Sequence, residues 1–377
     1  MKQFFLSRRD AMHSRDAMHC VSTLAIFAAI VVSAAFVFSS CDFFDLPEKD
    51  DDDDNNEIVI EETDEQRMAI IKQKFKEIQT WTPATMPEIT SEDLFLTVPS
   101  SVSPYRTGVV KPEVLKGGLN TINLMRYIAG LPDDIELDAN FTDLCQHGAV
   151  VVSAIKQLTH YPTKPAGMSD EFFQKGAHAA RVSNISSTNL PYYAIRGQML
   201  DTGFEENIRG VGHRRWLLHP MFKKTGIGIS ADTGTGTRYC LVYVTGGGGD
   251  AAYDYIAWPS PGAFPAELMR VDIPWSISVN LSKYGTPSPE KVKVELKHIQ
   301  TGKTFNFSKD APNSDDIFEN FFTIVANNCI IFRPEQFLIV GRLYHAFDYD
   351  PGDVFQVKVT GLNEDIVYQV KLFKALE

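Results

Sequence analysis

The sequence lacks an excess of positive charge. Its 377 residues include 36 Lys or Arg and 48 Asp or Glu, which gives a formal net charge of -12. Proteins that bind nucleic acids usually present a basic face to the phosphate backbone. We therefore expect no nucleic acid among its partners.

Cysteine is also scarce, because the chain has five, too few and too scattered for a disulfide scaffold or a zinc ribbon. Cys145, Cys240 and Cys329 have apolar neighbours and are predicted to be buried thiols. A bridge among these three stays open. The glycine run 246–249 lacks the Lys-Ser/Thr pair that follows a phosphate-binding loop, which argues against nucleotide binding.

Long apolar runs are rare, and the most prominent one, residues 21–38, lies near the N-terminus. Basic residues precede it and Ser39-Ser40-Cys41 follows it, a pattern typical of a secretory signal. The cysteine after small residues resembles a bacterial lipobox, which implies cleavage after residues 1–40 and lipid on Cys41. We expect a lipid-anchored protein of the bacterial cell envelope, in the outer membrane or at the cell surface. The alternative is an uncleaved transmembrane anchor, for which the run is long enough.

Residues 41–63 carry a concentrated block of acidic side chains, including the aspartate run 50–54. Like charges repel one another and remain solvated, so we interpret this segment as a flexible tether. An acidic calcium-binding tail is the alternative.

The middle of the chain has mainly helical spacing. Residues 64–81 form an amphipathic pattern, and the proline-rich stretch up to 112 predicts an extended connection. Asp138 and Ser169 are good N-caps, and Gly130 is a good C-terminal stop. The predicted helices cover 115–129, 138 to about His160, 169 to about 180, 191–201 and 212–218. Strands are predicted over 225–231 and 239–245, with a turn at 232–236 between them.

From about residue 259 the apolar residues alternate with polar ones, as in 292–296 and 354–360. Period two is typical of half-buried strands, so residues 259–377 are predicted to be a linker and a small antiparallel β-sandwich. The chain as a whole is therefore predicted to be α+β.

The order of these features resembles the CAP superfamily, which includes cysteine-rich secretory, antigen 5 and pathogenesis-related proteins. The residues that carry the resemblance are 119–126, 130–132, Leu137, 158–160, 183–185, 194–201, 212–214, 226–228 and 239–244. The resemblance implies an α-β-α sandwich over residues 112–258, preceded by the helix and connection of 64–111. Residues 257–262 and 274–276 look like a linker found after bacterial CAP domains, before an immunoglobulin-like domain.

In that family two histidines and two acidic residues line a cleft, and the histidines can hold a divalent metal. The resemblance assigns His160 and His213 to the histidine positions. Ser183, beside Asn184, stands where one acid is usual, and Asp201 stands at the other. Neutral imidazoles suit zinc, so zinc is a possible cofactor. With one acid lost, two-carboxylate acid/base chemistry is not expected.

Structural roles remain open for both histidines. His160 could be a cation at a helix C-terminus or a core histidine, and His213 could bond backbone at a helix start. A serine nucleophile at Ser183 would need a base within hydrogen-bond reach. Arg214 and Arg215 are expected to pair with Glu205 or Glu206.

Three functions follow as hypotheses. The first is a non-enzymatic protein whose cleft binds an unknown ligand or protein partner. The second is a metal-assisted hydrolase that uses His160, His213 and Asp201. The third, suggested by resemblance alone, is a lipid or sterol carrier.

Overall fold

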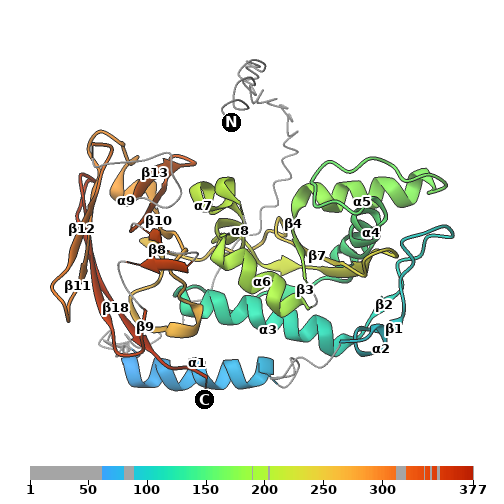
Figure 1. Cartoon of the computed structure of the whole chain (residues 1–377), viewed down its shortest axis with the longest axis horizontal. Helices are drawn as coiled ribbons and strands as arrows, with labels where there is room; N and C mark the ends of the chain where they lie inside the picture. The colour runs from blue at the N-terminus through green and yellow to red at the C-terminus, as the bar shows by residue number, and fades with distance from the viewer. Residues whose placement is uncertain are drawn as a thin grey trace, which may run out of the picture. The chain divides into compact units, whose positions relative to one another are not determined.

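The computed structural model describes residues 62–79, 89–188, 190–202, 204–310, 320–334, 336–339, 342–345 and 349–376. Predictions for residues 1–61, including the signal, Cys41 and the acidic tether up to residue 61, lie outside this part of the chain. All described residues belong to one compact unit, Ile60–Glu377, which contains both helices and sheets (Figure 1). The predicted α+β class agrees with this mixed content.

A three-stranded antiparallel sheet organises the first half of the unit. Its order is β4 (Ser183–Ser187), β7 (Arg238–Tyr243) and β6 (Ile227–Ala231), so β7 is central. Along β7, Leu241 packs with helices α4 (Ala139–Ile155) and α5 (Asp170–Val182), whereas Val242 packs with α3 (Pro112–Ile128) and α6 (Pro191–Leu200). Because alternate residues of a strand face opposite sides, helices cover both faces of this sheet.

Two glycines allow the layers to approach one another closely. A Cβ on Gly228 in β6 would lie 2.2 Å from the main-chain carbonyl of Cys145 in α4. A Cβ on Gly118 in α3 would lie 2.5 Å from Ile227 Cδ1 on the other face of the sheet. At Gly228 the neighbour is the backbone of α4, so a larger residue would push the layers apart, whereas at Gly118 the neighbouring side chains would have to shift.

The second half contains two larger sheets. One has the order β13 (Phe321–Val325), β14 (Cys329–Arg333), β10 (Trp275–Val279) and β8 (Tyr255–Trp258). The other has the order β12 (Thr304–Phe307), β11 (Lys293–His298), β17 (Val354–Thr360), β18 (Ile366–Phe373) and β9 (Gly262–Pro265). Trp275 of β10 contacts Phe355 of β17, and Phe332 of β14 contacts Phe307 of β12, so the two sheets pack against each other. The predicted antiparallel arrangement within 259–377 is wrong in two respects, since β8 lies before residue 259 and β9 pairs in parallel with β18.

The outer face of the four-stranded sheet positions a further helix. Ile331 and Cys329 of β14 pack against Ile208 of α7 (Glu205–Gly210) and Val211, which precedes α8 (Gly212–Leu217). α7 was not predicted, because a six-residue helix is too short to show a period. Its packing fixes the start of α8 and hence the position of His213.

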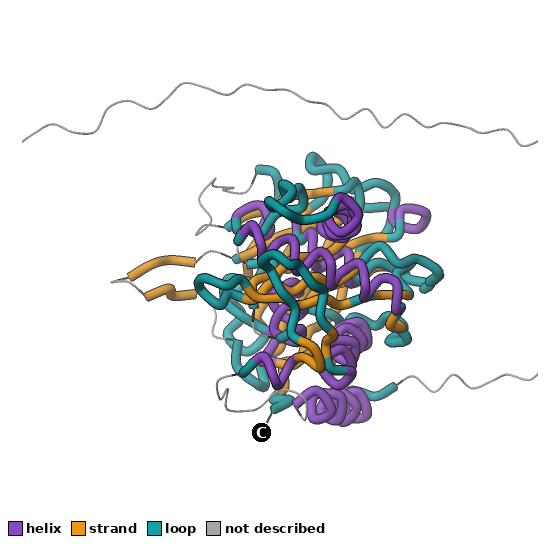
Figure 2. Tube along the Cα trace, turned by 90° about the vertical axis from the view of Figure 1, so that its right-hand side faces the viewer, coloured by secondary structure: helices purple, strands orange, loops and turns teal. Residues whose placement is uncertain are grey.

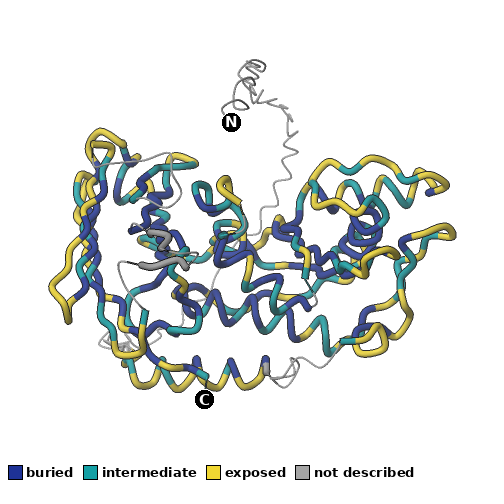
Figure 3. The backbone as a smooth tube through the Cα atoms, in the orientation of Figure 1, coloured by how far each residue is buried: buried dark blue, intermediate teal, exposed yellow. Residues whose placement is uncertain are grey.

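Helix α1 (Asp64–Gln79) joins the two halves. Its buried residues Ile71, Phe75 and Ile78 pack beside α3, and Figure 3 shows exposed residues between them. Arg67 donates from Nη2 to the carbonyl of Ile128 and from Nε to that of Ala263 in β9, at 2.5 and 3.3 Å. The amphipathic prediction for 64–81 is confirmed over the described residues.

The remaining elements are short. β15 (Gln336–Ile339) and β16 (Arg342–His345) form a separate hairpin, which projects from the body in Figure 2. The others are α2 (Ser91–Leu94), β1 (Phe95–Thr97), β2 (Val109–Val110), β3 (Glu136–Leu137), β5 (Lys224–Thr225), η1 (Ala266–Leu268) and α9 (Leu281–Tyr284). The expected extended connection up to residue 112 thus contains, in its described part, α2 and the pair β1–β2.

One predicted boundary is wrong in a way that matters for the site. The helix that Asp138 caps was expected to continue to His160, but α4 ends at Ile155. Lys156 adopts a left-handed conformation with φ of 55° and stops the helix. His160 therefore lies on the loop that follows α4, so the helix does not set the direction of its side chain.

Candidate functional site

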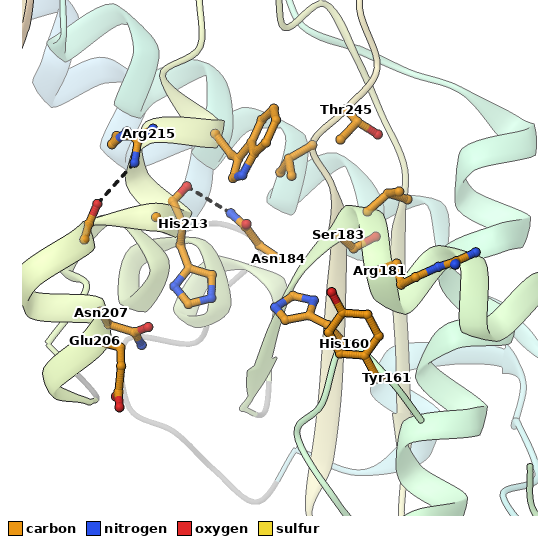
Figure 4. A pocket seen from close by; sticks show the side chains of 15 residues that line it. His160, Tyr161, Arg181, Ser183, Asn184, Glu206, Asn207, His213, Arg215 and Thr245 are labelled. Atoms are coloured by element: carbon orange, nitrogen blue, oxygen red, sulfur yellow. Dashed lines mark hydrogen bonds between the residues drawn. The ribbon is translucent and has the colours of Figure 1, made fainter. Parts of the chain in front are cut away.

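A pocket of about 450 Å³ collects most of the predicted site residues. Its lining includes His160, Ser183, Asn184 and His213, together with Glu206 and Trp216. These residues come from the loop after α4, the first residues of β4, and the helices α7 and α8. Figure 4 shows the imidazoles of His160 and His213 facing each other across this pocket.

The ring of His213 is oriented by Asp201. His213 Nδ1 donates to Asp201 Oδ1 at 2.6 Å, and the Asp201 side chain is fully buried. Because an ionised carboxylate can only accept, the Nδ1 atom must carry the proton. The Nε2 atom is therefore left without a proton in the neutral imidazole, with its lone pair available to a ligand.

Asp201 reaches this position through its backbone. It follows the last residue of α6 as the C-cap and adopts the left-handed conformation, with φ of 53°. Its second oxygen, Oδ2, accepts the main-chain N–H of Arg214 at 3.0 Å. Both carboxylate oxygens thus bind the first turn of α8, where a negative charge is favoured by the helix dipole.

The ring of His160 is oriented by main chain. Its Nδ1 atom lies 2.7 Å from the carbonyl oxygen of Ala180, near the end of α5. A carbonyl oxygen only accepts, so Nδ1 again carries the proton and Nε2 has the lone pair. The two histidines therefore share one tautomer, although one is fixed by a carboxylate and the other by a peptide group.

Arg214 is buried behind the site and connects the elements that position it. It is 1% exposed, and its guanidinium donates to the carbonyls of Met199, Leu200 and Pro274 and to Ser276 Oγ. Burial lowers the pKa of Arg214 to about 10, so it remains charged at neutral pH. The expected pairing of Arg214 and Arg215 with Glu205 or Glu206 is wrong. Glu205 pairs with Arg209 at 2.9 Å, Arg214 links α6 to β10, and Arg215 contacts the carbonyl of Gly210.

Ser183 and Asn184 form the floor of the pocket. Asn184 Nδ2 donates to the carbonyl of His213 at 3.0 Å and lies 3.3 Å from Gln198 Oε1. Ser183 Oγ lies 3.5 Å from Cys145 Sγ and, within the described residues, makes no hydrogen bond to either histidine. Ser183 consequently has no base in position to activate it as a nucleophile.

The thiols are not reactive groups. Cys145, Cys240 and Cys329 are free and fully buried, as predicted, and no bridge joins them. Burial raises the pKa of the Cys145 thiol to about 12, and the hydrogen bond from Ser183 offsets only part of this effect. The thiol beside the pocket floor therefore stays protonated and poorly nucleophilic.

The donor set fits a metal ion only in part. Histidines that bind metals usually donate their second ring N–H to a carboxylate or a carbonyl, as His213 and His160 do. However, the described residues contain no group of three or more His, Cys, Asp or Glu side chains placed to hold a metal. Asp201 is directed at His213 Nδ1 and Arg214 N, so it serves as a positioning residue.

Several lining residues were not identified from the sequence. Glu206 and Asn207 come from the missed helix α7, while Tyr161, Arg181 and Trp216 complete the walls. The adjacent pair Glu205-Glu206, with Arg209 four residues after the first, is a helix-start signal that could have revealed α7. Trp216 is 47% exposed and lines the pocket, so its ring is accessible to a ligand there.

No protein-family model matches the chain, and no curated protein matches it either. Among the described helices, none is both long and apolar enough to cross a membrane.

Proposed function

We propose that this protein is an exported, lipid-anchored cell-envelope protein of CAP-like fold that binds a ligand between His160 and His213 without catalysis. The apolar run and Cys41 support the anchor, and the helices on both faces of the β4–β7–β6 sheet support the fold. The observation that carries the binding function is that both histidines line one pocket while the Nδ1 atom of each lies within hydrogen-bond distance of a fixed oxygen acceptor.

Two fixed acceptors select the chemistry of the ligand. Each Nε2 atom, in its neutral form, accepts a hydrogen bond, so a ligand that brings two donors satisfies both imidazoles at once. Because their Nδ1 atoms are already bonded, the rings lose little conformational entropy when the ligand binds. The arrangement lacks a nucleophile with an adjacent base among the described residues, which favours binding over turnover.

A fragment panel tests this proposal. Hydroxyl-, amine- and carboxylate-bearing fragments would be titrated into the full-length chain and into His160→Phe and His213→Phe, which keep a ring but lose the nitrogens. We expect fragments whose affinity falls about tenfold in each variant, the loss of one good hydrogen bond. His147, whose ring packs against Phe172 of α5 and does not line the pocket, provides the matched control, and His147→Phe should bind like the wild type.

Two results would overturn the proposal. One is a panel in which no fragment distinguishes the wild type from the His160 and His213 variants. The other is turnover of a peptide, ester or glycan that disappears in His213→Ala, because this would make the pocket an active site.

The second candidate is a metal-assisted hydrolase, favoured by the hydrogen bonds that fix both Nδ1 atoms. Here His160 and His213 would hold the ion through Nε2, and Asp201 would act through His213 rather than as a ligand. Elemental analysis of the wild type, His160→Ala and His213→Ala decides between the candidates. Stoichiometric zinc lost in both variants supports this function, and no metal at micromolar supply contradicts it.

A further inference from the structure

Two more pockets adjoin the histidine pocket, one on each side. One, of about 370 Å³, shares Arg215 and Trp216 with it and continues past α8 to Tyr253 and Leu281. The other, also about 370 Å³, shares His160, Tyr161 and Arg181 and continues over α5 to Phe173. Because each neighbour shares lining residues with a different end of the central pocket, the three pockets adjoin one another, and we call them together the trough.

The two junctions of this trough have the same composition. At one, Tyr161 is 80% exposed and stands beside Arg181; at the other, Trp216 is 47% exposed and stands beside Arg215. Each junction therefore combines a flat aromatic face with a guanidinium group. Figure 4 shows Arg181 and Tyr161 on the His160 side of the central pocket and Arg215 on the His213 side.

The guanidinium groups of Arg181 and Arg215 have N–H donors that can bind a ligand. Within the described part of the chain, Arg181 makes no hydrogen bond or ion pair through its side chain, and it is exposed. Arg215 makes one long bond, from Nη1 to the carbonyl of Gly210 at 3.5 Å. A guanidinium group presents a planar set of donors that matches a carboxylate in two parallel hydrogen bonds.

The junctions favour a ligand carboxylate, whereas the centre of the trough disfavours one. Glu206 is the one acidic residue among the described residues that line the three pockets, and it belongs to the central pocket. A ligand carboxylate placed there would be repelled, whereas a hydroxyl group can donate to the Nε2 atoms of His160 and His213. The favourable pattern is hydroxyl groups at the centre and carboxylates toward both ends.

We propose that the trough binds an extended acidic oligosaccharide of uronic-acid type, with sugar rings stacked on Tyr161 and Trp216 and carboxylates paired with Arg181 and Arg215. The apolar face of a sugar ring packs against an aromatic ring, and its hydroxyl groups supply the donors that the histidines lack. This inference rests on the proposed ligand-binding function and names its ligand class.

Calorimetric titration of the full-length chain tests the inference, with tetragalacturonic acid as the probe. Galacturonic acid and neutral maltotetraose are the comparison ligands. We expect the tetramer to bind at least tenfold more tightly than the monomer, and the neutral tetramer to bind more weakly than the acidic one. Arg181→Gln and Arg215→Gln should each lower affinity for the acidic tetramer about tenfold, since each removes a charged hydrogen-bonding partner.

Matched variants separate the trough from general charge. Arg106→Gln removes an exposed arginine outside the three pockets and should leave tetramer affinity unchanged. Tyr161→Ala and Trp216→Ala should weaken binding of both acidic and neutral tetramers, because stacking does not depend on the carboxylate. Circular dichroism melting curves identify any variant whose weaker binding reflects misfolding.

Three outcomes would overturn the inference. Equal affinity for monomer and acidic tetramer would mean that the ligand occupies one pocket. Hexaglutamate that binds more tightly than the tetramer, with the same sensitivity to Arg181→Gln and Arg215→Gln, would identify a peptide as the occupant. No binding of any acidic probe, while fragments still bind through His160 and His213, would remove the glycan and leave the proposed function standing.

Discussion

Asp201 holds His213 Nδ1 at 2.6 Å with one carboxylate oxygen and uses the other to bind the first turn of the helix that carries this histidine. One buried side chain thus fixes both the tautomer and the place of the ring. The pocket therefore depends on a residue that does not line it.

Asp201→Asn is expected to weaken ligand binding with little change in fold. Asparagine tolerates the left-handed conformation at this position, but it has one acceptor oxygen and places an NH2 donor where the second carboxylate oxygen accepts from His213 or Arg214. We expect the free energy of unfolding to fall by about 1–2 kcal/mol. Nitrogen-15 NMR of the imidazole should show a larger Nε2–H fraction for His213.

The control for this substitution is Asp143→Asn, whose carboxylate lies 3.5 Å from His147 Nδ1 outside the pocket. It should leave the His213 signals unchanged. An unaltered His213 tautomer in Asp201→Asn would contradict the positioning role.

Arg214→Lys is expected to destabilise the protein by about 3 kcal/mol, because one ammonium group cannot satisfy three carbonyls and a hydroxyl arranged around a planar fork. Ser276→Ala removes a single partner of the same guanidinium and should cost about 1 kcal/mol. Urea denaturation measures both. Equal losses in the two variants would show that Arg214 is held mainly by Ser276.

Two glycine substitutions should have opposite effects on stability. Gly228→Ala places a Cβ 2.2 Å from the Cys145 carbonyl group, so α4 must move and stability should fall by about 3 kcal/mol. Gly197→Ala, in the interior of α6, meets nothing within 4 Å and should raise stability by about 0.5–1 kcal/mol. Thermal melting of both variants checks the prediction, which a stabilised Gly228→Ala would refute.

The turn between β6 and β7 should make stability depend on pH below about 4. The Thr235 hydroxyl, with main-chain donors at Thr235 and Gly234, lowers the pKa of Asp232 to about 2. The contribution of ionised Asp232 to the stability of the folded protein is therefore fully present above the ordinary pKa of 3.8 and is lost as the pH falls through about 2. The difference in melting temperature between wild type and Asp232→Ala should be constant above pH 5 and shrink toward pH 2.

Thr235→Val provides the matched comparison, because it removes the hydroxyl donor but retains the main-chain donors. The difference in melting temperature between the wild type and Thr235→Val should change over the same pH range but be smaller than that for Asp232→Ala. A difference in melting temperature that grows as the pH falls would contradict the prediction, because a carboxylate with a lowered pKa loses its stabilising effect on acidification.

Local signals predicted much of the secondary structure. Asp138 caps α4 and Ser169 caps α5 as expected, because each accepts main-chain hydrogen bonds that are decided within a few residues. The end of α4 was not predictable, since Lys156 enters the left-handed region without the usual glycine. β8 and β9 were also missed, because their pairing with β10 and β18 depends on residues far along the chain.

The site was predictable in its members but not in their roles. Resemblance identified His160, His213, Ser183 and Asn184, and all four line one pocket. It gave Asp201 as a possible ligand, whereas the backbone of Asp201 turns its carboxylate toward α8. Arg214 was expected to pair with Glu205 or Glu206, because no sequence pattern distinguishes an arginine that bonds buried carbonyls from one that pairs with acids.

The parallel pairing of β9 with β18 has a consequence for how the chain assembles. Residues 262–265 are synthesised long before 366–373, yet they occupy adjacent places in the five-stranded sheet. The contact is therefore of high sequence separation, and the entropy of closing so long a loop must be overcome before the sheet is complete. Since Arg67 on α1 binds Ala263 in the same strand, the N-terminal helix can secure β9 while the last strand is still missing.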